Sequence, residues 1–287
     1  MISIILGSYN RLPRLQTCIQ SIQNAGIYLS EPPEIIVIDG GSTDGSLQYL
    51  YNLQPTTDIK VIEEGALHGV TRAYNRGFRL ASKKFVTWTS DDCEYLPDCL
   101  MHVVNRLLNE NNKTLVSISM SDGPGKPFIN YGENTPVGAG SKDIFKAVDF
   151  WSEDFITYAS DNDFSIKIHR AGGRVVAELN AKIIHHLDLH DNLHNINVPT
   201  NRDSARYVKL YGHRNFNIVK SGRRIYPNIW INANSLIALM NKVEELRSSV
   251  SWGNYYTSNN FEAIPLLESM NINVEDFRGQ SSYDLVY

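Results

Sequence analysis

Four short, largely apolar runs, each followed by a polar loop and a helical pattern, constrain the fold of this chain most strongly. The runs have the length of strands and cover residues 2–6, 35–38, 60–62 and 85–88. Runs of this kind are typical of strands that are buried on both faces of a parallel sheet. The alternating order predicts a doubly wound α/β fold with right-handed crossovers. The loops that follow the strands should therefore meet at one edge of the sheet, where open α/β folds bind ligands.

The fourth run delivers two adjacent carboxylates to that edge. The run ends at Trp88, and Asp91 and Asp92 follow it before a helix opens near Asp98. A hard divalent cation that bridges phosphate oxygens prefers oxygen ligands of this type. The alternative is a solvated turn with a helix cap at Asp98.

Two other loops carry groups that suit a nucleotide. Asp39 ends the second run in a glycine-rich loop, and an acid at this place commonly meets a ribose or a base edge. Arg72 stands in the first turn of a predicted helix at residues 70–81, where a helix N-terminus favours an anion. The alternatives are an ordinary βα turn and a solvated arginine. Asn10 is expected to cap the helix that follows the first run.

Charge and cysteine usage narrow the class of protein. The chain has 287 residues, with 27 Lys and Arg against 31 Asp and Glu and a formal charge of -4, which argues against a nucleic-acid-binding surface. Its three cysteines have no zinc-site spacing and fit a reducing compartment without disulfides. We find no signal peptide and no run of 18 apolar residues, so we expect a cytoplasmic protein without a transmembrane segment.

Taken together, the loops resemble family 2 glycosyltransferases with the GT-A fold. The motifs that carry this resemblance are Ile4-Ile5-x-Gly-Ser-Tyr-Asn-Arg, the loop at residues 36–46, Gly69-x-x-Arg72-x-x-Asn75-x-Gly77, and Ser90-Asp91-Asp92. Their order and spacing match the family across residues 2 to about 190. The resemblance implies a Rossmann-like, mostly parallel central sheet flanked by helices. It also implies an inverting transfer from a nucleotide-activated sugar, usually with Mg²⁺ or Mn²⁺.

The same resemblance assigns the donor site by position. It places nucleotide-sugar contacts at Ser8, Tyr9 and Arg11 (near the base), Asp39 (base or ribose), Arg72 (base or diphosphate) and Asp91 (ribose). Asp92 would bind the metal. The chain departs from the family at Thr89, where many members carry a further aspartate.

The general base is expected in the second half of the chain. Asp161 opens a predicted helix and aligns with the family's catalytic Asp, although Ser160 replaces the Glu that usually precedes it. Inversion needs a carboxylate within hydrogen-bond reach of the acceptor hydroxyl, opposite the leaving group. Asp163 is a further acceptor-site candidate. The alternative is that Asp161 and Asp163 only stabilise the helix dipole in the first turn.

A histidine and an aromatic residue complete the predicted site. Relatives often place one His after a short strand, where it can complete the metal shell or touch the diphosphate, and His185 fits this position best, with His186 as the alternate. Trp151, next to Phe150, could stack on an acceptor sugar. A core aromatic pair is the alternative.

We therefore expect one GT-A domain at residues 1–195, with a nucleotide-binding half at about 1–95 and an acceptor half at about 96–195. Residues 196–287 should form a mainly helical extension. The expected reaction moves a sugar, from UDP more than from other nucleotides, to a saccharide or lipid-linked acceptor in surface polysaccharide or glycoconjugate synthesis. Peripheral contact with the inner face of the membrane and the oligomeric state stay open. The alternative function is a catalytically degenerate protein of the same fold that binds a nucleotide sugar or a partner.

Overall fold

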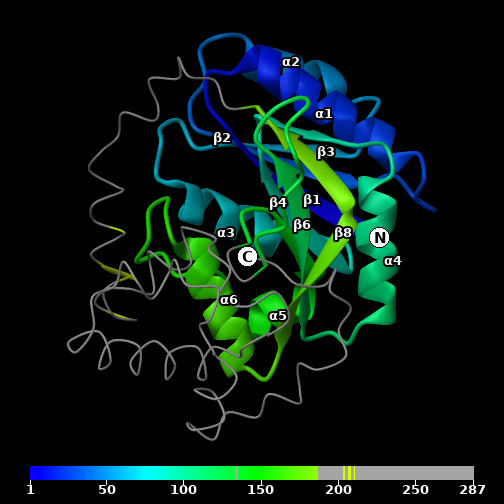
Figure 1. The fold of residues 1–287 in the computed structure, drawn as a ribbon. Helices are drawn as coiled ribbons and strands as arrows, with labels where there is room; N and C mark the ends of the chain where they lie inside the picture. Colours follow the sequence, from blue (N-terminus) through cyan, green and yellow to red (C-terminus); the bar gives the residue numbers. More distant parts are fainter. Residues whose placement is uncertain (133–134, 187–202, 204–205, 208–209, 211–287) are drawn as a thin grey trace, which may run out of the picture.

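A computed structural model describes residues 1–132, 135–186, 203, 206–207 and 210 (Figure 1). Its centre is an eight-stranded sheet with the strand order β3-β2-β1-β4-β7-β6-β8-β5. The elements of the first half are β1 Ile2–Ser8, α1 Leu12–Gly26, β2 Glu34–Asp39, α2 Ser46–Leu53, β3 Ile59–Glu63, α3 Val70–Leu80 and β4 Phe85–Ser90. Those of the second half are β5 Cys93–Tyr95, α4 Cys99–Asn109, β6 Thr114–Ser121, β7 Gly138–Ser141, α5 Lys142–Ala147, α6 Ser160–Arg170 and β8 Arg174–His185.

Helices cover both faces of the sheet, as the buried runs predict (Figure 1). Ile4 of β1 packs in one core with α1, α2 and α4, and Ile5 packs in a second core with α3, α5 and α6. Successive side chains of a strand point to opposite faces, so a strand between two helical layers is buried and largely apolar along its length. The four predicted strands and the three predicted helices of the first half are all present.

The two halves of the sheet differ in strand direction. β1 pairs in parallel with β2 and β4, and β2 pairs in parallel with β3. In the second half β7 runs antiparallel to both β4 and β6, while β8 is parallel to β6 and antiparallel to β5. Residues 174–185 form one long strand rather than a short strand and a separate segment, because its register on β6 shifts at a bulge beside Ile118 and continues.

The prediction that Asn10 caps α1 is wrong. Asn10 adopts a left-handed conformation (φ 51°), and its Oδ1 accepts a hydrogen bond from the backbone N of Thr43 at 2.7 Å. The backbone N of Leu12 instead donates to Asp44 Oδ2 at 2.8 Å. The two loops that follow β1 and β2 therefore brace each other at the ligand-binding edge.

The predicted helical extension falls almost wholly outside the described residues, and the boundary at residue 195 stays a prediction. Residues 203, 206–207 and 210 are described and helical. Among the residues that the structure describes, no helix is long and apolar enough to cross a bilayer.

The approach of α3 to β1 gives the first testable prediction. A Cβ at Gly77 would lie 2.2 Å from Cγ2 of Ile5, so Gly77→Ala forces a helix and a buried strand apart. We expect the free energy of unfolding to fall by about 1–2 kcal/mol, because the packing strain exceeds the gain in helix propensity. Urea denaturation measures this change.

Leu80→Ala serves as the control, because this exposed side chain lies in the same helix. It should change stability by no more than about 0.5 kcal/mol. A Gly77→Ala protein as stable as the wild type would show that α3 does not need this close approach.

Candidate active site

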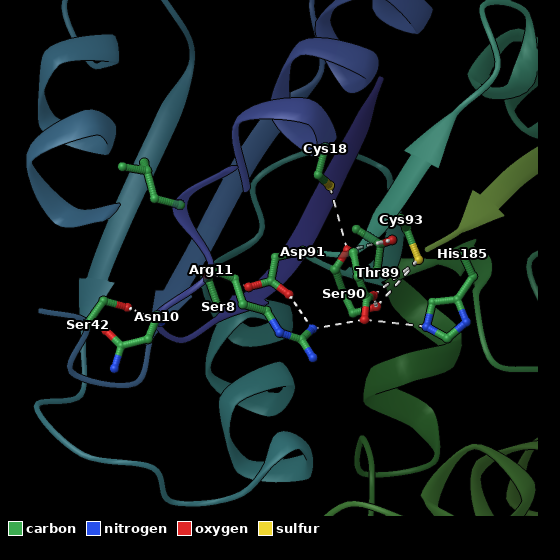
Figure 2. A network of polar contacts seen from close by, with 12 residues as sticks. Ser8, Asn10, Arg11, Cys18, Ser42, Thr89, Ser90, Asp91, Cys93 and His185 are labelled. Atoms are coloured by element: carbon green, nitrogen blue, oxygen red, sulfur yellow. Dashed lines mark hydrogen bonds and ion pairs between the residues drawn. The ribbon is translucent and has the colours of Figure 1, made fainter. Parts of the chain in front are cut away.

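The predicted site residues from three distant parts of the chain meet at the carboxyl ends of β1, β4 and β8 (Figure 2). β1 and β4 are parallel neighbours with Gly7 opposite Ser90, so the residues after each strand emerge together. The side chains of Ser8 and Arg11 come from the first strand and its loop, and the carboxylates of Asp91 and Asp92 from the fourth.

Arg11 joins the two carboxylates. Its Nη1 lies 3.0 Å from Asp91 Oδ1 and 2.9 Å from Asp92 Oδ2. Ser8 Oγ donates to the other oxygen of Asp91 at 2.9 Å. Asp91 and Asp92 are only 3% and 7% exposed, and buried carboxylates persist only where charge and hydrogen bonds compensate them. The guanidinium therefore offsets the repulsion between these two adjacent acids.

The two carboxyl groups nevertheless titrate differently. Burial raises the pKa of Asp91 to about 6, and the charge of Arg11 offsets only part of that effect. Burial also acts on Asp92, but His185, Ser90 and Arg11 outweigh it and hold the pKa of Asp92 well below its usual range. Asp92 is therefore ionised over the whole neutral range, while Asp91 exchanges its proton near pH 6.

The structure brings His185, not His186, to the carboxylates. Nε2 of His185 lies 3.4 Å from Asp92 Oδ2, and its Nδ1 lies 3.7 Å from Asp122 Oδ1. His186 turns away, and its Nε2 lies 2.8 Å from Glu94 Oε2. Consecutive side chains along an extended strand point in opposite directions, which separates the two imidazoles. Burial lowers the pKa of His185, but the contact with Asp92 outweighs this and raises it.

Asp92 and His185 form a donor set that fits a divalent metal. Two ligand atoms that bind one ion at right angles, each at about 2.1 Å, lie about 3 Å apart. This is close to the 3.4 Å between His185 Nε2 and Asp92 Oδ2. Within the described ranges, no group of three or more His, Cys, Asp or Glu side chains comes together in a way that could hold a metal. A metal here would take its other ligands from a diphosphate and from water, as Mg²⁺ commonly does.

Asp39 and Arg72 take different positions around this centre. Asp39 lies opposite Ser8 in the sheet, but its Oδ1 accepts from the backbone N of Gly41 at 2.9 Å and of Ser42 at 2.8 Å, and its Oδ2 accepts from Ser42 Oγ at 2.5 Å. Its carboxylate therefore shapes its own loop. Arg72 is exposed in the first turn of α3, and no contact among the described residues joins it to Asp91 or Asp92. Tyr9 is half-buried beside Gly40.

Asp161 lies in the first turn of α6. Burial raises its pKa to about 6, and backbone N–H groups at Asn162 and at Asp161 itself offset part of this rise. A carboxyl group with a pKa near 6 suits a general base that works at neutral pH.

Two predicted acceptor residues are buried instead of lining the site. Trp151 is 4% exposed, and its ring packs edge-on against Trp88 at 5.2 Å and against Tyr74 at 5.4 Å. Trp151 therefore belongs to the aromatic core, as the alternative interpretation of the sequence proposed. The prediction that it stacks on an acceptor sugar is corrected. Asp163 is 3% exposed in the first turn of α6.

Three contributors to the site were missed or had no role assigned from the sequence. Asn75 exchanges two hydrogen bonds with the backbone of Trp151, at 2.9 and 3.0 Å, although its motif alone gave it no role. Asp122 reaches His185 from a loop whose composition indicates only a turn. Ser90 Oγ donates to Asp92 Oδ1. Asn75 and Asp122 contact residues that are distant in the sequence, and Ser90 contacts a residue two positions away. Sequence spacing alone indicates none of these contacts.

The fold and the arrangement of polar groups at the sheet edge are those of an α/β domain of the GT-A type. Residues 3–173 match the model of glycosyl transferase family 2, which is more than half of the chain, and the protein belongs to that family. The prediction of the family is confirmed.

Two curated relatives are glycosyltransferases that match part of the chain. The GalNAc(5)-diNAcBac-PP-undecaprenol beta-1,3-glucosyltransferase of Campylobacter jejuni is 34% identical over 107 residues, which cover 37% of this chain and 34% of the relative. The poly-beta-1,6-N-acetyl-D-glucosamine synthase of Staphylococcus epidermidis is 30% identical over 86 residues, which cover 30% of this chain and 20% of the relative. The chain thus spans about a third and a fifth of their lengths.

Solved structures confirm the GT-A fold. S. aureus TarS 1-349 in complex with UDP-GlcNAc matches with a TM-score of 0.59 and 16% identity, over 78% of this chain and 76% of that one. The mannosyltransferase PcManGT from Pyrobaculum calidifontis, in complex with GDP-Man and Mn2+, matches with a TM-score of 0.58 and 14% identity, over 98% of this chain and 83% of that one.

The coupling of His185 to Asp92 can be tested by NMR titration of the histidine ring in the presence of a chelator. We expect the pKa of His185 to lie above its ordinary value of about 6.5 in the wild type and to fall in Asp92→Asn, where Asp122 remains to oppose the effect of burial. Glu94→Gln is the control, because it changes the partner of His186 alone. An unchanged His185 titration in Asp92→Asn would show that the two groups are not coupled.

Proposed function

We propose that this glycosyltransferase moves a sugar from a UDP-sugar to a hydroxyl group of a saccharide or lipid-linked acceptor, with inversion at the anomeric carbon. The observation that carries the proposal is the convergence of Ser8, Arg11, Asp91, Asp92 and His185 at the carboxyl edge of β1 and β4. A cluster of cation-binding and hydrogen-bonding groups at this edge suits a nucleotide diphosphate.

The names of the similar proteins support the substrate classes. The relative from C. jejuni is named for an undecaprenol-linked substrate, and TarS binds UDP-GlcNAc in its solved structure. We therefore favour a UDP-sugar donor and a lipid-linked or polysaccharide acceptor in surface glycoconjugate synthesis. A lipid-linked acceptor would bring the protein to the inner face of the membrane from the cytoplasm.

We assign the metal to Asp92 and His185. The structures of the mannosyltransferase PcManGT and of GalNAc-T7 each contain Mn2+ together with GDP-Man or UDP, which supports Mn²⁺ or Mg²⁺ here. When bound, the cation supplies positive charge that neutralises the departing diphosphate. The Arg11 guanidinium, which already lies 2.9 Å from Asp92, adds positive charge at the same place.

Asp161 acts as the general base in this proposal. Its carboxylate accepts the proton of the acceptor hydroxyl as that oxygen bonds to the anomeric carbon, and the bond between that carbon and the diphosphate breaks on the opposite face. Only the ionised carboxylate can accept the proton. Because the pKa of Asp161 is about 6, turnover should rise with pH through about 6 and level off above it.

Asp161→Asn tests the base directly. We expect kcat to fall by about 10²–10⁴-fold, because the amide cannot accept the proton, and nucleotide affinity to change by less than about threefold. Turnover of UDP-sugars against a panel of saccharide and lipid-linked acceptors, together with calorimetry of UDP binding, measures both.

Asp143→Asn is the matched control, since Asp143 is an exposed acid in the first turn of α5. It should leave kcat within twofold. Undiminished transfer by the Asp161→Asn protein would exclude Asp161 as the base.

A further inference from the structure

The segment that precedes Asp161 places the proposed base. Residues 148–159 connect α5 to α6 and end at Ala159, a non-glycine residue in the left-handed conformation (φ 61°). Ala159 has no polar side-chain group that could cap α6 at its N-terminus. Because Ala159 also adopts a strained backbone conformation, contacts of the preceding segment help to fix the start of this helix.

One side of this segment is attached to α3. Asn75 bonds to both backbone groups of Trp151, and the backbone N of Thr71 donates to the carbonyl of Ile156 at 3.2 Å. A Cβ at Gly69 would lie 2.8 Å from Cγ2 of Ile156, so the backbone approaches closely at the start of α3. Arg72 stands in that same first turn.

The other side is held by Asp203, which lies beyond residues 3–173 that match the family model. Its buried carboxylate accepts hydrogen bonds from three successive backbone N–H groups: Ile156 at 3.0 and 3.1 Å, Thr157 at 2.7 Å and Tyr158 at 2.9 Å. Successive N–H groups of this kind form an anion-binding concavity, and bonds to a charged acceptor are stronger than neutral ones.

Two neighbours of Asp203 contact the same segment. Tyr207 is 1% exposed and packs in a small core with Phe155, Ala159 and Ile166. Arg206 forms an ion pair with Asp154 at the surface. The buried contacts of Asp203 and Tyr207 therefore frame the segment that leads into α6, and the exposed pair adds little to this hold.

We propose that Asp203 is a positioning residue for sugar transfer, which fixes residues 156–158 so that Asp161 keeps its place relative to the start of α3. The proposal rests on the proposed function of Asp161 as the base. Ile156 makes the connection, because its N–H donates to Asp203 while its carbonyl accepts from Thr71. A chain segment far from the donor motifs thus completes the geometry between donor and base.

Asp203→Ala and Asp203→Asn test this role, with Arg206→Ala as the matched control from the same helical segment. In Asp203→Ala we expect kcat to fall by about 10–100-fold, because small displacements of a catalytic group have effects of this size. The KM for the donor and the affinity for UDP should stay within about threefold. Asp203→Asn keeps one acceptor oxygen and should lose less, and Arg206→Ala should stay within twofold.

A second readout separates positioning from a loss of folded protein. Burial raises the pKa of Asp161, so a displaced Asp161 becomes more exposed and the acidic limb of the kcat profile moves from about pH 6 to lower pH. A loss of folded protein lowers the amplitude of the profile and leaves that limb in place. An unmoved limb, or an unchanged kcat, in Asp203→Ala would overturn the proposal. If Asp203→Ala does not fold, the same criteria apply to Asp203→Asn.

Carboxyl NMR titration of Asp161 in the Asp203 variants gives a reading that does not need turnover. A lower pKa supports the positioning role, and an unchanged pKa overturns it. Transfer retained by Asp161→Asn would instead refute the proposed base and leave this titration unaffected, so the two failures can be told apart.

Discussion

The repulsion between two adjacent buried carboxylates is the constraint on which this structure depends. Asp91 and Asp92 leave the end of β4 together, where little water reaches them. Arg11 lies within 3.0 Å of both, and His185 lies 3.4 Å from Asp92. The two carboxylates therefore favour positive charge at this site. Positive charge would also neutralise a departing diphosphate.

The topology of the sheet explains how these groups meet. Parallel pairing of β1 with β4 brings the Ser8–Arg11 loop to the carboxylates across more than 80 residues of sequence. The antiparallel strand β7 then joins β4 to β6, and β8 returns alongside β6 to bring His185 from the far end of the domain. The parallel half presents the proposed donor contacts, and the antiparallel half returns the chain to the same edge.

The sequence alone predicted the parallel half well. Strands that are buried on both faces appear in the sequence as clear runs of apolar residues. The motifs that follow these runs identify the family. β5, β6 and β7 were not predicted. β5 and β7 have three and four residues, and their sequences, Cys93–Tyr95 and Gly138–Ser141, show no strand period.

Residues whose roles depend on tertiary contacts were the hardest to predict. Trp151 reads equally well as a stacking platform or a core residue, and only its contacts with Trp88 and Tyr74 decide for the core. Asp203 has no motif at all, since its partners are backbone N–H groups some 45 residues earlier in the chain. His185 and His186 are adjacent, and the register of β8 on β5 decides between them.

The most direct test of the central claim is calorimetric titration of UDP and GDP into the wild type and Asp92→Asn, each with and without Mn²⁺. Asp98→Asn, which changes an exposed carboxylate, is the control. Our account predicts that one nucleotide binds strongly only with Mn²⁺ and that Asp92→Asn weakens this binding at least tenfold, about 1.4 kcal/mol. Nucleotide binding that needs neither Mn²⁺ nor Asp92 would contradict the account.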